Sequence, residues 1–295
     1  MTGDPDFIAV DWGSTNRRAY LIGRDGSVLD FLRDDVGVKA MHGRSFAEEA
    51  RRLRARFGDR PMICAGMAGS DRGWVPVPYR DCPAGLAELA GALHWVEPGR
   101  TAIVPGLKVR ADGKGDVMRG EEVQILGAVQ AGLVPDSARV CQPGTHCKWA
   151  DVVGGRLATF RTTMTGELFA LLRDHSLLAD MLTGEAKIGP AFDDGIADAQ
   201  RSRLLGDLFG IRAGGLLGLR RNEDAASYLS GLLIGSDVRE QHGNSEEDMV
   251  ILADPVFGEF YRRALKARGI DSRIVDSESA FIAGIAHIRM LSHDA

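Results

Sequence analysis

Two short turns in the chain combine glycine with hydroxyl-bearing side chains, and each follows directly after an apolar run. The first reads Asp-Trp-Gly-Ser-Thr-Asn at residues 11–16, and the second reads Gln-Pro-Gly-Thr-His-Cys at residues 142–147. Such turns offer backbone N–H groups and hydroxyls to an anion, and their small residues let the backbone approach it closely. One turn of this kind is most often only a turn. Two of them, one in each half of the chain, predict a pair of loops that can hold a triphosphate between two domains.

Several side chains in and beside these turns have the chemistry to bind phosphate. Arg18 could neutralise phosphate charge, although a solvated charge on a hairpin is the structural alternative. His146 could donate to a phosphate oxygen, but a lone histidine in a turn is as often structural. The predicted phosphate contacts are Gly13, Ser14, Thr15, Arg18, Gly144, Thr145 and His146.

One carboxylate precedes the first loop. Asp11 lies at the expected end of a strand, two residues before Gly13. Mg²⁺ keeps several waters in proteins and is usually bound through one or two carboxylates together with substrate phosphates. Asp11 is therefore the predicted metal residue, and the alternative is that its side chain only caps the turn.

Both loops must be carried by β-hairpins. Residues 7–12 read as a buried strand, and Asp25-Gly26 is a strong signal for the turn of the hairpin that follows. Gly154-Gly155 has the same place after the second loop, so the second half repeats the pattern of the first. Late in each half, strands alternate with helices, which indicates parallel strands beside the hairpin. We expect an α/β protein with a domain boundary near Asp136.

Composition narrows the class of protein. The chain has 295 residues, 44% of them hydrophobic, which suits one large or two medium globular domains. A formal net charge of −5 gives no basic footprint for nucleic acid or a membrane surface. None of the four cysteines forms a C-x-x-C pair, and the first ten residues lack the features of a signal peptide. We expect a soluble, cytoplasmic protein with free thiols and no membrane span.

The two hairpins resemble the phosphate-1 and phosphate-2 loops of the actin-like ATPase fold, which is also the fold of hexokinase and the glycerol-kinase-type sugar kinases. A narrower set of motifs runs in order along the chain: DWGSTNRRA, AGMAGS, VMRGEE, PGTHCKW, TMTGEL and LSGLLIG. This set resembles the 2-dehydro-3-deoxygalactonokinase (2-keto-3-deoxygalactonate kinase) family, and the later AFIAGI also fits. The resemblance therefore extends over nearly the whole chain.

The resemblance implies the fold and the reaction. The fold would be two ribonuclease H-like (actin-like ATPase) domains with the active-site cleft between them. Residues 1–136 would carry the first loop, the sugar-acid site and the base, and residues 137–295 the second loop and the nucleotide site. The enzyme would use ATP and Mg²⁺ to phosphorylate the 6-hydroxyl of 2-dehydro-3-deoxy-D-galactonate in galactonate catabolism.

The resemblance also implies a catalytic base at the start of a helix near Gly120. Glycerol kinases carry an aspartate there, and this chain carries Glu121, followed by Glu122. Neighbouring residues of a helix point about 100° apart, so Glu122 is expected to have a structural role. The alternative is that both acids only stabilise the positive N-terminus of the helix.

A sugar acid also needs a cation for its carboxylate. Arg119 suits bidentate recognition of a carboxylate. However, a base and an anchor on nearly adjacent residues must reach opposite ends of a six-carbon chain. Arg119 could instead contact phosphate, which leaves Lys148, Arg18 and Arg161 as other anchors. The predicted substrate contacts are Ser70, Arg119 and Lys148.

Two points stay open at the level of sequence. Asp254 stands where the family usually has glycine near the adenosine, so no nucleotide contact is carried over to that position. The alternatives to the kinase are a kinase for another 2-keto-3-deoxy sugar acid and a non-catalytic, sugar-sensing protein of actin-like fold. The expected partners are a sugar acid and ATP, without nucleic acid or membrane, and a homodimer is left open.

Overall fold

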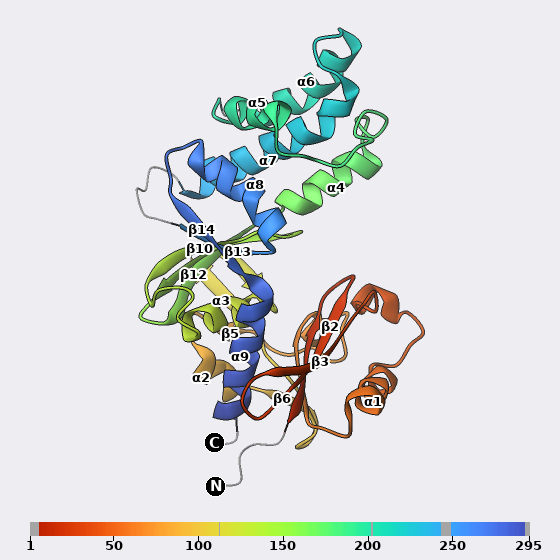
Figure 1. The fold of residues 1–295 in the computed structure, drawn as a ribbon, viewed down its shortest axis with the longest axis vertical. Coiled ribbons are helices and arrows are strands. Elements are labelled where there is room, and N and C mark those ends of the chain that lie inside the picture. The colour runs from red at the N-terminus through yellow and green to blue at the C-terminus, as the bar shows by residue number, and fades with distance from the viewer. Residues whose placement is uncertain (1–5, 112, 202, 243–248, 293–295) are drawn as a thin grey trace. The chain divides into compact units, whose positions relative to one another are not determined.

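The computed structural model describes residues 6–111, 113–201, 203–242 and 249–292. These residues form two compact units, which are described separately (Figure 1). Unit 1 comprises residues 1–137, 151–160 and 277–295, and unit 2 comprises residues 138–150 and 161–276. The first segment of unit 1 ends at residue 137, and the predicted domain boundary lies near Asp136. Residues 151–160 and 277–295 are also counted with unit 1, whereas the prediction places residues 137–295 in one domain.

Unit 1 is built on a six-stranded sheet in the order β3-β2-β1-β4-β7-β6. Strands β1 to β3 pair antiparallel, β1 pairs parallel with β4, and β4 pairs parallel with β7. The bounds are β1 Phe7–Trp12, β2 Arg17–Ile22, β3 Val28–Asp34, β4 Met62–Gly66, β6 His94–Glu97 and β7 Thr101–Ile103. The hairpin followed by parallel strands confirms what the turn signals and the alternation of elements predicted.

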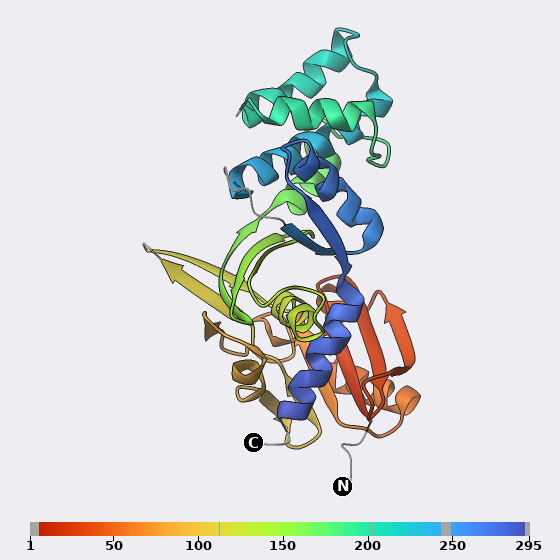
Figure 2. The same cartoon turned by 60° about the vertical axis from the view of Figure 1, so that its left-hand side comes forward.

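A smaller sheet in unit 1 has the strand order β5-β8-β9. Its strands are β5 Arg80–Asp81, β8 Leu107–Ala111 and β9 Lys114–Met118. The antiparallel β8–β9 pair, yellow in Figure 2, leads directly to the helix that begins at Glu121. Sequence reasoning did not identify this hairpin.

The helices of unit 1 pack on the sheet and on one another. They are α1 Phe46–Phe57, α2 Leu86–Ala90, α3 Glu121–Gln130 and α9 Ser277–Leu291, with short 3₁₀ turns η1 Val38–Met41 and η2 Met67–Gly69. Helices α3 and α9 approach so closely that a Cβ on Gly284 would lie 3.1 Å from the Cα of Gly127. This glycine contact explains why the last helix of the chain belongs with the first unit.

A second, five-stranded sheet repeats the strand arrangement of the six-stranded one. It has the order β12-β11-β10-β13-β14, and its parallel strands β10, β13 and β14 belong to unit 2, whereas residues 151–160 of β11 and β12 are counted with unit 1. The bounds are β10 Ala138–Gln142, β11 Cys147–Val153, β12 Arg156–Thr163, β13 Met249–Ala253 and β14 Ser272–Asp276. The order matches β3-β2-β1-β4-β7 strand for strand, so the internal repeat predicted from the two loops is present in the fold.

Helices make up the rest of unit 2. They are α4 Thr165–His175, α5 Pro190–Ala199, α6 Leu204–Leu216, α7 Ala225–His242 and α8 Pro255–Lys266, with η3 at Asn222–Asp224. Helix α7 packs closely on α5, where a Cβ on Gly235 would lie 2.8 Å from the Cβ of Ala199. Within the described part of the chain, no helix has the length and apolar character needed to cross a lipid bilayer.

Candidate functional site

Backbone hydrogen bonds from residues 37–39, at the start of η1, hold the first loop in place. Gly37 donates to the carbonyl of Thr15 at 3.1 Å, Val38 donates to Gly13, and Lys39 donates to Ser14 at 2.9 Å. A Cβ on Gly37 would overlap the backbone of Thr15, so only glycine allows this approach. The loop carbonyls are therefore tied to the protein, which fixes the shape of the loop.

Asp11 lies at the end of β1, directly opposite Arg18 on β2. Burial raises the pKa of Asp11 to about 6, the charge of Arg18 acts to lower it, and the charges of Glu121 and Glu278 raise it further. A divalent cation at this carboxylate would favour its ionised form and offset the effect of burial. The position therefore fits a bound Mg²⁺ in charge and donor type.

In the part of the chain that the structure describes, few side chains are placed to share a metal ion with Asp11. Among the described residues, no group of three or more His, Cys, Asp or Glu side chains is placed to hold a metal ion. A Mg²⁺ bound at Asp11 would therefore complete its shell with water and ligand oxygens, which is its usual behaviour beside phosphates.

Two glycines bring the helix start of α3 close to the end of β1. Gly66 has φ +85° and Gly120 has φ +103°, a region that favours glycine. A Cβ on Gly66 would lie 2.8 Å from the carbonyl oxygen of Trp12, and one on Gly120 would lie 3.1 Å from the Cα of Gly66. The ends of β1 and β4 therefore lie close to the beginning of α3. Because of this proximity, the charge of Glu121 raises the pKa of Asp11.

The two neighbouring acids of α3 have different surroundings. Glu121 is half-buried, and its Oε2 accepts from the backbone N–H of Arg119 at 3.1 Å. Glu122 is fully buried, and both of its oxygens accept from the N–H of Gly120, at 2.9 and 2.7 Å. Burial, together with the nearby charge of Glu121, raises the pKa of Glu122 to about 8. These are the contacts of a carboxyl group that holds the helix start in place.

A cavity of about 460 Å³ in unit 1 brings Ser70 and Arg119 together. The Oγ of Ser70 donates to the carbonyl of Met67 at 2.8 Å, and Met67 forms part of the cavity wall. Arg119 is 8% exposed, and its Nη2 donates to the carbonyl of Val77 at 2.7 Å. Its guanidinium carbon lies 4.3 Å from the ring centre of Tyr79, over the face of the ring.

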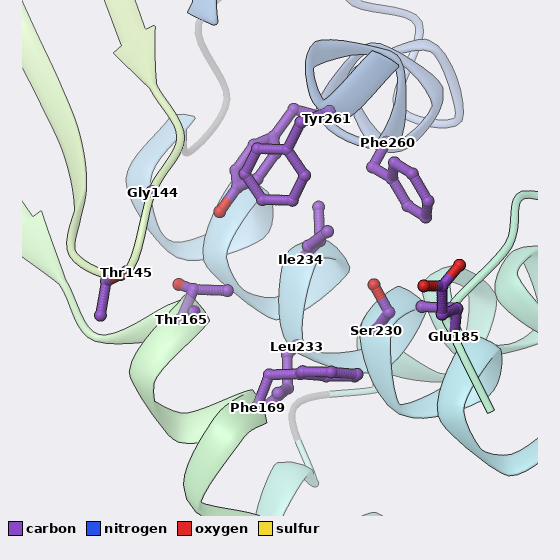
Figure 3. A pocket seen from close by; sticks show the side chains of 13 residues that line it. Gly144, Thr145, Thr165, Phe169, Glu185, Ser230, Leu233, Ile234, Phe260 and Tyr261 are labelled. Carbon is purple, nitrogen blue, oxygen red and sulfur yellow. The ribbon is translucent and has the colours of Figure 1, made fainter. Parts of the chain in front are cut away.

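The second loop borders a separate cavity, of about 450 Å³, within unit 2 (Figure 3). Gly144 and Thr145 line it on one side, with Thr165 and Phe169 from α4. The N–H of Glu167 donates to the carbonyl of Thr145 at 2.9 Å, so the first turn of α4 is attached to the loop. The N-terminus of a helix carries partial positive charge, so this attachment suits a loop that binds an anion.

The remaining walls of this cavity are mainly apolar and come from α7 and α8. Figure 3 shows the rings of Phe169, Phe260 and Tyr261 around it, with Ser230 and Glu185 at the other end. Its mainly apolar surface and its few polar groups are typical of a binding site for a small molecule.

His146 lies in the second loop, and Lys148 lies in β11, which follows it. His146 pairs with Glu167, with 2.6 Å between Nε2 and Oε2, on a partly exposed surface. Lys148 is 3% exposed in β11, and its Nζ lies 3.5 Å from the carbonyl oxygen of His146. Lys148 therefore belongs to unit 2, whereas Ser70 and Arg119 share the cavity of unit 1.

Sequence reasoning missed Asp237, which connects several elements beside the second loop. Its carboxylate accepts from Trp149, Thr163, Thr165 and Tyr261 at distances of 2.8 to 3.0 Å. Burial raises the pKa of Asp237, and its four hydrogen bonds act to lower it. The signal available in the sequence was a single acid at the end of the apolar run LSGLLIG.

Asp254 has a structural explanation. It is the N-cap of α8, and its Oδ1 accepts from the N–H of Val256 at 2.9 Å and of Phe257 at 3.4 Å. Asp254 therefore stabilises the start of the helix that carries Phe260 and Tyr261 to the cavity.

Comparisons with known proteins agree with one another over nearly the whole chain. The model of the family described as 2-keto-3-deoxy-galactonokinase matches residues 11–288. The 2-dehydro-3-deoxygalactonokinase of Escherichia coli (strain K12) is 36% identical over 287 residues, which are 96% of this chain and 97% of that protein. A solved structure from Sinorhizobium meliloti, described provisionally as a 2-dehydro-3-deoxygalactonokinase, is 34% identical with a TM-score of 0.90, covering 96% of this chain and 95% of the other.

A more distant structure bears on the fold alone. The activator of the 2-hydroxyisocaproyl-CoA dehydratase from Clostridium difficile, solved with bound ADPNP, is 10% identical with a TM-score of 0.53. The match covers 98% of this chain and 96% of the activator. Together with the repeated strand order, this likeness confirms the expected α/β fold of two ribonuclease H-like domains, the actin-like ATPase fold.

Proposed function

The chain belongs to the 2-keto-3-deoxy-galactonokinase family, and from this premise we propose that it transfers the γ-phosphoryl group of ATP to the 6-hydroxyl of 2-dehydro-3-deoxy-D-galactonate. The products would be ADP and the 6-phosphate, within galactonate catabolism. The observation that carries the proposal is the similarity to the Escherichia coli enzyme over 96% of the chain. Membership of a kinase family implies the use of ATP, and Mg²⁺ is its usual companion.

Glu121 is the proposed catalytic base. Transfer of a phosphoryl group to an alcohol asks the protein mainly to position the reactants, to neutralise charge and to accept the proton of the hydroxyl. The start of α3 and the end of β1 meet where Gly66 and Gly120 allow close packing, so Glu121 and Asp11 are held in the same neighbourhood. The hydrogen bond from the Arg119 N–H to Oε2 orients the Glu121 carboxylate.

Asp11 is the proposed magnesium residue. Bound there through a carboxylate and water, Mg²⁺ would supply positive charge to the phosphate oxygens during transfer. Arg18 lies opposite Asp11 in the hairpin and already acts electrostatically on it, so Arg18 is the proposed arginine for phosphate charge in unit 1.

The two loops supply the proposed phosphate contacts. In the first loop these are Gly13, Ser14 and Thr15, whose carbonyls are tied to the segment that begins η1. In the second loop Gly144 and Thr145 line the cavity of unit 2 beside the first turn of α4. His146 stays a proposed contact, and it would have to leave Glu167 to reach a phosphate.

The cavity of unit 2 is the proposed nucleotide site. Its apolar walls suit the base, and Ser230 and Glu185 offer polar groups at the end away from the loop. Ser70, Arg119 and Lys148 are the proposed contacts of the sugar acid, of which Ser70 and Arg119 lie in one cavity.

The test is an ADP-release assay with purified protein, ATP, Mg²⁺ and a panel of 2-keto-3-deoxy sugar acids. We expect the highest kcat/KM with 2-dehydro-3-deoxy-D-galactonate. A higher value with the gluco epimer would assign the enzyme to another acid of the same class. No substrate-dependent ADP from any acid of the panel, from protein that still binds these acids, would instead support a sugar-sensing role.

A further inference from the structure

Arg119 combines deep burial with unused hydrogen-bonding capacity. Its side chain is 8% exposed, and only its Nη2 has a protein acceptor, the carbonyl of Val77. Among the described residues, neither Nε nor Nη1 has a hydrogen-bond partner. Buried guanidinium nitrogens without an acceptor are costly, so this group is suited to an anionic ligand that supplies acceptors.

Three neighbours hold the guanidinium in one orientation. The ring of Tyr79 lies beneath it at 4.3 Å, and the carbonyl of Val77 holds one nitrogen. Gly69 packs against the guanidinium on another side, since a Cβ added to Gly69 would lie 2.7 Å from Nη1 of Arg119. Tyr79 is itself supported by Gly106, since a Cβ there would lie 2.8 Å from two ring carbons. The position of the charge is therefore determined by packing around it.

The cavity has room for a ligand larger than a simple ion. Its volume of about 460 Å³ is lined by Arg119, Ser70 and Tyr79, with Asp71 and Arg72 at the exposed side. A planar guanidinium matches a carboxylate in shape and donor spacing better than an ammonium group does. The Oγ of Ser70, whose proton is donated to the carbonyl of Met67, can accept from a hydroxyl group of a sugar acid.

We infer that this cavity is an acid-selecting subsite, in which Arg119 binds the carboxylate of the substrate and Tyr79 is the residue that positions Arg119. This inference rests on the proposed kinase function. The sequence left Arg18, Lys148 and Arg161 as other anchors. Arg119 is favoured over them because it has unpartnered nitrogens and lines a cavity that Ser70 also lines.

Arg119 and Glu121 are nearly adjacent in sequence, but their functional groups have different surroundings. The Glu121 carboxylate accepts from the backbone N–H of Arg119, at the start of the helix. The guanidinium of Arg119 lies against Val77 and Tyr79. In the proposed binding mode, one end of the six-carbon acid meets Arg119 and the other meets Glu121.

The test compares the sugar acid with its neutral analogue 3-deoxy-D-galactosone, in which an aldehyde replaces the carboxylate. For the Arg119→Gln variant we expect KM for the acid to rise about 10- to 100-fold while KM for ATP stays unchanged. The preference for acid over aldehyde, measured as the ratio of kcat/KM, should fall by the same factor. Arg110→Gln, a change of an exposed arginine on β8 outside this cavity, is the matched control and should leave both values unchanged.

Variants of Tyr79 test positioning separately from folding. Tyr79→Phe keeps the ring face and should behave like the wild type. Tyr79→Leu removes the face and should raise KM for the acid roughly 3- to 30-fold with kcat and KM for ATP unchanged. If Arg119→Gln lowers kcat/KM for acid and aldehyde equally, or raises KM for ATP alone, Arg119 is not the carboxylate anchor. If Tyr79→Leu leaves the acid preference intact, Tyr79 does not position it.

Calorimetry separates this inference from the proposed function. The full chain is titrated with 2-dehydro-3-deoxy-D-galactonate in the absence of ATP. Binding that is weakened by Arg119→Gln and unaffected by Arg110→Gln supports the subsite even if the protein releases no ADP. Binding of equal strength in the wild type and Arg119→Gln would overturn the subsite even if the kinase is active.

Discussion

At the residue scale, Glu121 and Glu122 show how one step along a helix changes the chemistry of a carboxyl group. Glu122 is enclosed, its pKa is raised to about 8, and both of its oxygens accept from Gly120. Glu121 is half-buried, and its Oε2 accepts from the backbone N–H of Arg119. Accessibility therefore favours Glu121 as the residue that meets the substrate.

The first prediction separates these two acids. Glu121→Gln should lower kcat by about 10²- to 10⁴-fold with KM for ATP near its original value, because a proton acceptor is lost while nucleotide contacts remain. Glu122→Gln is the matched control and should retain most of kcat, since an amide oxygen can still accept from Gly120. Steady-state kinetics measure both, and a fully active Glu121→Gln would remove its role as base.

The second prediction concerns metal binding at Asp11. Asp11→Asn should weaken the dependence of turnover on Mg²⁺, because the amide carries no charge. In the wild type, activation by Mg²⁺ should become stronger as the pH rises through about 6, where Asp11 loses its proton. Titrations with Mg²⁺ at several pH values measure this, and equal Mg²⁺ dependence in the variant and the wild type would argue against the assignment.

The same residue predicts how stability changes with pH in metal-free buffer. The pKa of Asp11 is raised from 3.8 to about 6 in the folded protein, so its favourable contribution is complete below 3.8 and is lost as pH rises through about 6. Asp11→Asn should therefore gain stability relative to the wild type between about pH 4 and pH 6, by at most about 3 kcal/mol.

Denaturant unfolding in the presence of a chelator measures this difference. Asp136→Asn, at an exposed position, is the control and should show no trend. A constant difference between Asp11→Asn and the wild type across this range would contradict the raised pKa.

At the element scale, the two proposed phosphate loops occupy equivalent places in two different sheets, but they are supported differently. The first is tied through its carbonyls to residues 37–39. The second is held by the first turn of α4, where Gly166 packs so closely that a Cβ would collide with Gly144 and lie 2.9 Å from the Cα of Thr145. The strand order is repeated, whereas the support of each loop is particular to its unit.

The third prediction tests this support. Gly166→Ala should displace the second loop and raise KM for ATP, and overpacking of this kind costs about 1–3 kcal/mol of stability. Gly210→Ala is the matched control, because Gly210 lies in α6 with open space around it. It should leave KM unchanged and stabilise the protein by about 1 kcal/mol. Equal KM values for ATP in Gly166→Ala and the wild type would show that the loop tolerates the methyl group.

The two glycines of the AGMAGS motif, residues 65–70, allow close packing between elements of unit 1. Each of the two glycines has a separate contact: Gly66 packs against Trp12 and Gly120, and Gly69 leaves space for the side chain of Arg119. The motif was weak evidence by itself, because nothing in its letters indicates these distant partners. Its role follows from close approaches that only glycine permits.

At the scale of the whole molecule, each unit contains its own cavity, so two ligands should stabilise the protein independently. A ligand that binds the folded protein at 100 times its dissociation constant adds about 2.7 kcal/mol of stability. The fourth prediction is that MgATP and 2-dehydro-3-deoxy-D-galactonate each raise the thermal midpoint of the full chain.

Variants of the two cavities provide the controls for this prediction. Gly166→Ala should reduce the shift caused by MgATP and leave the shift caused by the acid, whereas Arg119→Gln should do the reverse. Differential scanning calorimetry measures these shifts. If either variant reduces both shifts equally, the ligands do not occupy the cavities assigned to them.

The sequence by itself determined the family, the α/β fold, both loops and the acids at the start of α3. These features depend on glycine turns and apolar strands, which are recognised within a few residues, and on the order of short motifs along the chain. The assignments of Asp11, Arg18 and the loop residues to metal and phosphate stay predictions.

Only the tertiary structure decided which polar groups share a cavity. Arg119 donates a hydrogen bond to Val77, which lies 42 positions away in the sequence, and Asp237 accepts one from Trp149, which lies 88 positions away. The same holds for α9, whose glycine contact with α3 joins the end of the chain to its first unit. Burial and close packing arise from residues far apart in the chain, so no local pattern could show which donors would be left for a ligand.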